Sequence, residues 1–161
     1  MASRAEGVPK ERPLTVLGAV VLPGTEQAVA LVRRYARALL GPGFPDLYEL
    51  TVVASELFTN AVRHSRSGPR PGDRRGGHVT VSFLAGAGVV RLEIADQGGG
   101  GAPRLRAPDD NGEGGRGLHV VEALSLGWGS ERRDRHTVVW ADFARPGDEP
   151  ISACETRRPD G

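Results

Sequence analysis

Four side chains able to hold a charged ligand recur at helical spacing between residues 56 and 64. Glu56, Asn60 and His64 follow one another at intervals of four, and Arg63 lies three residues after Asn60. On a helix this spacing puts a carboxylate, a carboxamide, a guanidinium and an imidazole on one stripe, where they can face a single cleft. Burying polar side chains costs free energy unless they bind a partner, so a polar stripe on a buried helix indicates a ligand. The alternative interpretation is that the stripe faces solvent and forms only weak charged pairs.

The other side of this helix is apolar and predicts how the stripe is positioned. Pro45-Asp46 favours a helix start, and apolar residues then recur at intervals of three and four. One face of the helix is therefore expected to lie in a core. The predicted anchoring residues are Leu50, Val53, Ala54, Leu57 and Ala61.

A carboxylate followed by glycines ends a predicted strand in the run Asp96-Gln97-Gly98-Gly99-Gly100. The carboxylate of Asp96 can accept a hydrogen bond from an exocyclic amine. The glycines lack side chains, so a flat base can approach the backbone. Taken alone, an ordinary Asp-x-Gly turn at the end of a strand explains the same residues.

A second glycine-rich run leads directly into a predicted short helix at 118–124. Its sequence is Gly112-Glu113-Gly114-Gly115-Arg116-Gly117-Leu118. Free backbone N–H groups and the helix dipole favour a phosphate there, and Arg116 can add a bidentate contact. The run is not a P-loop, because no Gly-Lys-Ser/Thr follows, and it lacks the strand-turn-helix context of a Rossmann fingerprint.

The remaining pattern predicts a sheet made mostly of hairpins. Strands are expected at 14–22, 78–85, 89–96, 125–130 and 137–143. The second and third are joined by Gly86-Ala87-Gly88, and residues 132–135 form the turn of the closing pair. Hairpin strands with helices before and between them favour an α/β (α+β) fold, in which one antiparallel or mixed sheet carries helices on one face.

One more helix is expected between the first strand and the polar helix. Thr25 is its predicted N-cap, and Gly41-Pro42-Gly43 stops it. Its apolar stripe comprises Ala28, Leu31, Val32, Tyr35, Ala36 and Leu39. The basic, Pro/Gly-rich residues 66–77 predict a mobile loop, and 98–117 predict a lid, a binding loop or disorder.

Length and composition narrow the class of protein. The 161 residues fit one domain at 12–144, with an arm at 1–11 and a tail at 145–161. A net charge of +1 gives no drive toward nucleic acid or an anionic membrane. Cys154, the one cysteine, excludes an internal disulfide framework, and no clustered ligands mark a metal hydrolase. No apolar run is long enough to span a membrane, and the N-terminus lacks the apolar core of a signal peptide. The cytoplasm is therefore the expected location.

In their order along the chain, the three polar pieces resemble the N, G1 and G2 boxes of the GHKL ATP-binding superfamily, which includes gyrase, histidine kinases and MutL. Within it the chain is most similar to anti-sigma factor serine/threonine kinases and their actinobacterial ATP-binding relatives. The matching phrases are ASELFTNAVRHS, IADQGGG, GEGGRGLHVVEAL, GWG and VVWADF. The resemblance covers roughly residues 14 to 144, and three boxes in order argue against a chance match.

The resemblance implies a two-layer α/β sandwich that holds ATP between its helices and a glycine-rich lid. It implies that Asn60 holds Mg²⁺ at the phosphates and that Glu56 activates the attacking hydroxyl or water. Asp96 would bind the adenine amine, and Gly98 and Gly100 would give the base room. The implied residues on the phosphate side are Arg63, His64, Gly115, Arg116, Gly117 and Leu118. For His64, a hydrogen-bonded imidazole at the helix end is the alternative.

The implied activity is that of a serine/threonine protein kinase. Family members of this type phosphorylate a small anti-anti-sigma (STAS-type) protein, sequester a sigma factor when free of it, and commonly form homodimers. One departure is visible: many relatives carry a Gly-Lys pair before the final strand, where this chain has Arg135-His136-Thr137. The details of the phosphate contacts therefore stay open.

Two hypotheses of different classes follow. The first is an ATP-dependent kinase that doubles as an anti-sigma factor, motivated by Glu56 together with Asn60 and both glycine boxes. The second is a nucleotide-sensing module that controls a partner protein with negligible catalysis; Glu56 argues mildly against it, because a sensor needs no base. A detached ATP-binding half of a histidine kinase fits less well, since no dimerisation helix with a phosphoacceptor histidine precedes the boxes.

Overall fold

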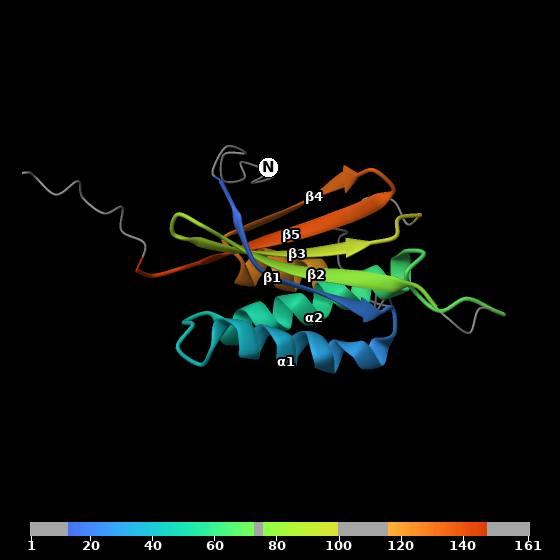
Figure 1. The fold of residues 1–161 in the computed structure, drawn as a ribbon, viewed down its shortest axis with the longest axis horizontal. Helices are drawn as coiled ribbons and strands as arrows, with labels where there is room; N and C mark the ends of the chain where they lie inside the picture. Colours follow the sequence, from blue (N-terminus) through green and yellow to red (C-terminus); the bar gives the residue numbers. More distant parts are fainter. Residues whose placement is uncertain (1–12, 73–75, 100–115, 148–161) are drawn as a thin grey trace, which may run out of the picture.

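Alternating apolar residues and two amphipathic stretches build one sheet with helices packed beneath it (Figure 1). The computed structural model of the chain describes residues 13–72, 76–99 and 116–147. The elements in chain order are β1 (Thr15–Pro23), η1 (Glu26–Ala28), α1 (Val29–Leu40), α2 (Leu47–His64), β2 (His78–Gly86), β3 (Val89–Asp96), α3 (Arg116–Leu124), β4 (Gly127–Arg133) and β5 (His136–Ala144). The predicted fold class, one sheet with helices on one face, is confirmed.

The strand order is β1-β2-β3-β5-β4, and every pairing in the described sheet is antiparallel. The hairpins β2–β3 and β4–β5 are the two that the turn signals predict. The pairing of β3 with β5 joins strands that are not neighbours in sequence, and it sets Asp96 opposite Thr137. This pairing brings the end of β3 next to the turn that precedes β5.

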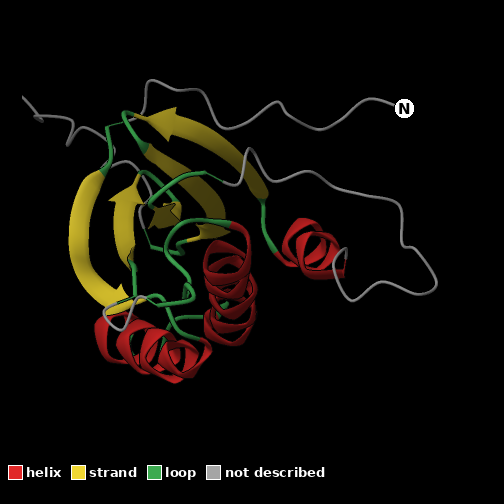
Figure 2. Cartoon of the chain, turned by 90° about the vertical axis from the view of Figure 1, so that its right-hand side faces the viewer, coloured by secondary structure: helices red, strands yellow, loops and turns green. Residues whose placement is uncertain are grey.

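The core lies between the inner face of the sheet and the helices α1 and α2, which Figure 2 shows side by side on one side of the strands. Along β2 every second residue faces inward, so Val79, Val81 and Phe83 are fully buried. Phe58 of α2 is also fully buried. Each such side chain contributes about 1.5–3 kcal/mol relative to an exposed position.

In α2 all five predicted anchoring residues are buried, with exposures from 0% to 7%. The helix begins at Leu47, directly after Asp46, whose side chain makes no capping hydrogen bond. It ends at His64, because Ser65 is extended. The apolar face thus fixes the rotation of α2, and with it the direction of the polar stripe.

The predictions for α1 were partly wrong. Thr25 precedes a 3₁₀ turn rather than the α-helix, which begins at Val29, and its side chain makes no capping bond. Leu31 is 42% exposed and does not belong to the apolar face. The other stripe residues are buried or pack against the core, and the ring of Tyr35 lies 5.8 Å from that of Phe83.

The boundaries near the C-terminal strands also differ from the prediction. The short helix begins at Arg116 and the first closing strand at Gly127, while Ser125 bonds the carbonyl of Val121 at 2.6 Å. The predicted arm, most of the tail with Cys154, and most of the lid lie outside the described residues. Among the described helices, none is long and apolar enough to cross a membrane.

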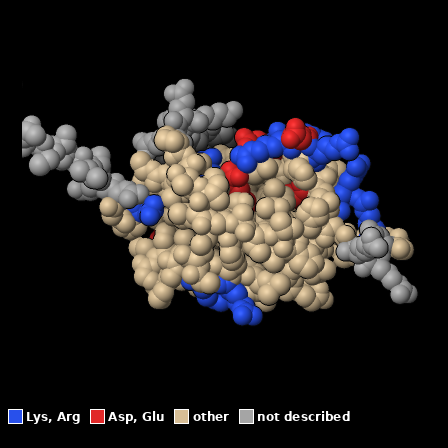
Figure 3. Space-filling model, in the orientation of Figure 1, with Lys and Arg blue, Asp and Glu red and all other residues tan. Residues whose placement is uncertain are grey.

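The outer face of the sheet carries ion pairs. Asp142 of β5 is fully buried, and Arg91 of β3 contacts both of its carboxylate oxygens, at 2.7 and 2.8 Å. The guanidinium of Arg91 also lies 4.1 Å from the ring centre of Trp140. Arg133 holds Glu93 at 2.8 and 3.0 Å. Figure 3 shows acidic and basic side chains gathered along the upper edge of the molecule, over β4 and β5.

Candidate functional site

The polar stripe of α2 meets the start of α3. A Cβ placed on Gly117 would lie 2.7 Å from Oε2 of Glu56 and 3.6 Å from Nδ2 of Asn60. Glu56 and Asn60 are both partly exposed. Any side chain at position 117 would therefore displace the Glu56 carboxylate, and two motifs about sixty residues apart in sequence form one cluster.

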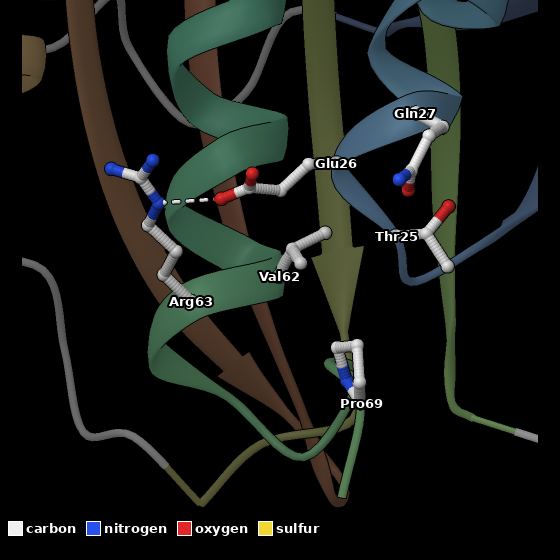
Figure 4. A pocket seen from close by; sticks show the side chains of 6 residues that line it. All are labelled: Thr25, Glu26, Gln27, Val62, Arg63 and Pro69. Carbon is white, nitrogen blue, oxygen red and sulfur yellow. Dashed lines mark hydrogen bonds and ion pairs between the residues drawn. The ribbon is translucent and has the colours of Figure 1, made fainter. Parts of the chain in front are cut away.

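Arg63 forms an ion pair with a residue outside this cluster. Its Nε lies 3.0 Å from Oε1 of Glu26 in η1, and both side chains are about half exposed, at 49% and 61%. An open hollow of about 420 Å³ is lined by Thr25, Glu26, Gln27, Val62, Arg63 and Pro69. Figure 4 shows the Arg63–Glu26 pair among these residues. His64, the last residue of α2, is exposed. The hollow is thus bordered by η1 and the end of α2.

Asp96 ends β3 and is only 8% exposed. Its Oδ1 accepts the N–H of Gly98 at 2.6 Å, and the backbone N–H of Thr137 also bonds this carboxylate. Burial raises the pKa of Asp96 above the usual 3.8, although these N–H groups and the nearby His136 act in the opposite direction. The protein therefore keeps a carboxylate in a place that penalises its charge.

The turn after Asp96 requires glycine. Gly98 has φ +74°, and a Cβ there would lie 2.4 Å from the carbonyl oxygen of Arg135. The Nδ1 of His136 lies 2.9 Å from the carbonyl oxygen of Asp96. The segment that departs from the family pattern, 135–137, therefore packs directly against the predicted base-binding turn.

The start of the loop after α2, within the segment predicted to be mobile, is hydrogen-bonded to the Asp96 turn. Its residue Ser67 is fully buried, and its Oγ accepts the N–H of Gln97 at 2.9 Å. The N–H of Arg66 donates to the carbonyl of Gly98 at 2.8 Å. Because α2 runs into this loop, one continuous segment carries the Glu56–Asn60 cluster and supports the Asp96 turn.

The remaining predicted site residues have different environments. Leu118 is 9% exposed and belongs to the core, whereas Arg116 is exposed at the first position of α3. Gly100 and Gly115 lie outside the described residues. In the described part of the chain, no group of three or more His, Cys, Asp or Glu residues could hold a metal ion.

Sequence reasoning missed Ser67 and Thr137 as parts of the site. Thr137 is 8% exposed, and it meets Asp96 because β3 pairs with β5. Strand patterning does not reveal which strands pair when they are distant in sequence. The composition of residues 66–77 predicted that Ser67 is exposed, because polar, Pro/Gly-rich segments usually lie in solvent.

Comparison with known proteins gives a family and a fold. Residues 22–143 match the family described as the histidine kinase-like ATPase domain. The chain is 26% identical over 117 residues to the serine-protein kinase RsbW of Bacillus pumilus (strain SAFR-032), covering 64% of this chain and 70% of that protein. It is similar to the solved RsbU and RsbW domains of a Mycobacterium tuberculosis protein, with a TM-score of 0.57 and 23% identity. This likeness covers 82% of the chain but 32% of that longer structure, and it supports the fold alone.

Proposed function

The chain belongs to the family of histidine kinase-like ATPase domains, and on that premise we propose that it is an ATP-binding regulator of the anti-sigma kinase type. The observation that carries the proposal is the buried carboxylate of Asp96. Backbone N–H groups hold it, and no arginine or lysine of the described residues forms an ion pair with it. Its remaining acceptor capacity suits the exocyclic amine of adenine.

The donor set fits ATP with Mg²⁺. Asp96 would accept the adenine amine, and the absence of a side chain at Gly98 would leave room beside the base. Asn60 would be a protein ligand of Mg²⁺, an ion that takes few protein oxygens and keeps several waters. Bound ATP and Mg²⁺ supply the phosphoryl group and part of the neutralising charge.

The start of α3 would border the phosphates. Gly117 keeps the space beside Glu56 and Asn60 free of a side chain, and Arg116 would contact the phosphates from the first position of the helix. Leu118 would anchor this segment in the core, and Gly100 and Gly115 complete the proposed set. Arg63 and His64 are assigned to the phosphate side, where Arg63 would have to leave Glu26 on nucleotide binding.

As a kinase, the protein would act mostly by positioning the attacking hydroxyl and the phosphates of ATP. Glu56 would accept the proton of a serine or threonine hydroxyl while the site aligns that hydroxyl for in-line attack. The similarity to the serine-protein kinase of Bacillus pumilus supports this proposal. Glu56 is partly exposed, so a partner's side chain can reach it.

The proposed partners are proteins. An anti-anti-sigma protein of the STAS type would be the phosphorylated substrate, a sigma factor would be the sequestered partner, and the regulator would act in transcription control as a cytoplasmic homodimer. Neither nucleic acid nor a membrane is part of the proposal, in keeping with the net charge of +1.

A second candidate, a nucleotide-sensing module without turnover, is favoured by one observation. The β4–β5 turn carries Arg135 and His136 where many relatives have a Gly-Lys pair, and it packs against the Asp96 turn. In this candidate ATP would still bind at Asp96 and Asn60, and lid ordering alone would control the partner.

Two measurements test the proposal in sequence. Millimolar ATP with Mg²⁺ should raise the melting temperature of the wild type by mass action, and a wild type without this shift contradicts nucleotide binding. Labelled ATP should then transfer its phosphoryl group to a cognate anti-anti-sigma protein. A Glu56→Gln variant that binds ATP and still controls the partner in cells would favour the sensing module over the kinase.

A further inference from the structure

Ser67 is a buried polar residue that the proposed chemistry does not use. It lies three residues after the end of α2 and is fully buried. Its Oγ accepts the backbone N–H of Gln97 at 2.9 Å, and its own N–H donates to Oγ of Ser65 at 3.0 Å. The hydroxyl of Ser67 is thus bound to the residue that directly follows Asp96.

The chain packs around Ser67 too closely for a side chain at two neighbouring positions. A Cβ on Gly24 would lie 1.6 Å from the carbonyl oxygen of Ser67, and one on Gly77 would lie 2.5 Å from its Cα. The N–H of Gly24 donates to the carbonyl of Gly77 at 2.9 Å. The ends of β1 and α2 and the start of β2 therefore meet at Ser67, which makes it a rigid point of attachment.

The Asp96 turn is held from both sides at this point. On one side Ser67 binds Gln97, and the N–H of Arg66 donates to the carbonyl of Gly98 at 2.8 Å. On the other side the carbonyl oxygen of Arg135 leaves no room for a Cβ on Gly98. The N–H of Gly98 in turn donates to Oδ1 of Asp96, so the position of the turn sets the direction of the carboxylate.

We propose that Ser67 is the positioning residue for recognition of the nucleotide base: its hydroxyl fixes Gln97 so that the Gly98 N–H holds the Asp96 carboxylate toward the exocyclic amine. The proposal rests on the function proposed above for Asp96. Removing the hydroxyl leaves the N–H of Gln97 without its acceptor and frees one side of the turn. The hydrogen bonds of Ser67 go to Ser65 and Gln97 and not to the phosphate-side residues Asn60 and Gly117, whose contribution should therefore be unchanged.

The test compares two nucleotides in the Ser67→Ala variant. ATP carries the exocyclic amine, whereas ITP carries a carbonyl at that place and presents the same phosphates. Ser67→Ala should weaken the binding of Mg²⁺·ATP about 3- to 10-fold, the value of one hydrogen bond, and should leave that of Mg²⁺·ITP unchanged. In an Asp96→Asn background the same substitution should have no further effect on ATP.

The matched control is Ser125→Ala, which removes one side chain–backbone hydrogen bond at the end of α3, to Val121. It should change neither affinity. If Ser67→Ala does not fold, Ser67→Cys changes only the side-chain oxygen to the larger sulfur, a weaker acceptor, and the same ATP-specific loss is expected.

A measurement without nucleotide separates the two proposals. Amide hydrogen exchange of Gln97 and Gly98 should become faster in Ser67→Ala, while exchange in the paired strand β5 should not change. Unchanged exchange at Gln97, or an equal loss of ATP and ITP affinity, overturns the positioning role alone. A wild type that does not distinguish ATP from ITP overturns the role of Asp96, and the role of Ser67 with it.

Discussion

Two aspartates of this protein, Asp96 and Asp142, are both buried but have opposite surroundings. Asp142 on the outer face of the sheet is 0% exposed, and Arg91 contacts both of its oxygens. Asp96 at the end of β3 is 8% exposed, and the groups that bond its carboxylate are backbone N–H groups. A glycine turn follows Asp96, whereas Arg91, with the ring of Trp140 beside it, contacts Asp142.

The difference separates a structural carboxylate from one that is available to a ligand. A bidentate arginine binds both oxygens of Asp142, and the hydrogen bond to Asp142 raises the pKa of Arg91, so Arg91 stays protonated. Asp96 keeps acceptor capacity in a desolvated place, where a polar ligand gains more than it would in water. Burial alone therefore does not identify a site; the kind of partner does.

The largest expected effect is the loss of stability when Asp142, the structural aspartate, loses its arginine. Arg91→Ala would leave the fully buried Asp142 carboxylate without its cation, and we expect a loss of about 3–5 kcal/mol in the free energy of unfolding. Urea denaturation followed by circular dichroism measures it. The double variant Arg91→Ala/Asp142→Ala should recover part of the loss; if Arg91→Ala costs less than 1 kcal/mol, Asp142 is not a buried structural ion.

Asp96→Asn should have the opposite effect: a small change in stability and a large loss of ATP affinity. The buried charge is removed and at most one hydrogen bond is lost, so the free energy of unfolding should change by less than about 1 kcal/mol. Affinity for ATP should fall about 10- to 100-fold, because a hydrogen bond to a charged acceptor is lost. Isothermal titration calorimetry checks the affinity. A variant that unfolds as Arg91→Ala does, yet binds ATP normally, would remove the distinction between the two aspartates.

The pH dependence of stability gives a finer test. Because the pKa of Asp96 is raised above 3.8 in the folded state, the folded protein binds this proton more readily than the unfolded chain. The protonation of Asp96 therefore contributes favourably to the free energy of unfolding below about pH 3.8, and this contribution is lost as the pH rises through the raised pKa. The stability of Asp96→Asn relative to the wild type should increase over that window and stay constant above it. A flat difference across the window contradicts a desolvated carboxylate.

The smallest effect is expected at the exposed ion pair. Arg63→Ala breaks the contact with Glu26, both members of which are about half exposed, so the unfolding free energy should fall by less than about 1 kcal/mol. Thermal melts at low and high salt measure it, and Glu26→Gln is the matched control. If Arg63→Ala weakens ATP binding while Glu26→Gln strengthens it, Arg63 exchanges Glu26 for a phosphate.

Elements whose determinants are local were well predicted. The apolar face of α2 follows from residue spacing, and all of its predicted anchors are buried. The hairpins β2–β3 and β4–β5 follow from alternation and short turns, although β4 begins two residues later than predicted. The prediction of a cap at Thr25 was wrong because the 3₁₀ turn η1 precedes α1, and the prediction that Leu31 is buried was wrong because it is 42% exposed.

By itself, the sequence determined the residue types of the site, the helices and strands that carry them, and the family. Periodicity and motif order are local properties of the chain, so they are evident in the sequence alone. The tertiary structure decided which polar groups meet. It set Gly117 against Glu56, Thr137 beside Asp96, and Arg63 against Glu26. It also buried Ser67 in a segment whose composition predicts solvent. These residues are far apart in the chain, and only the packed sheet and helices bring them close together.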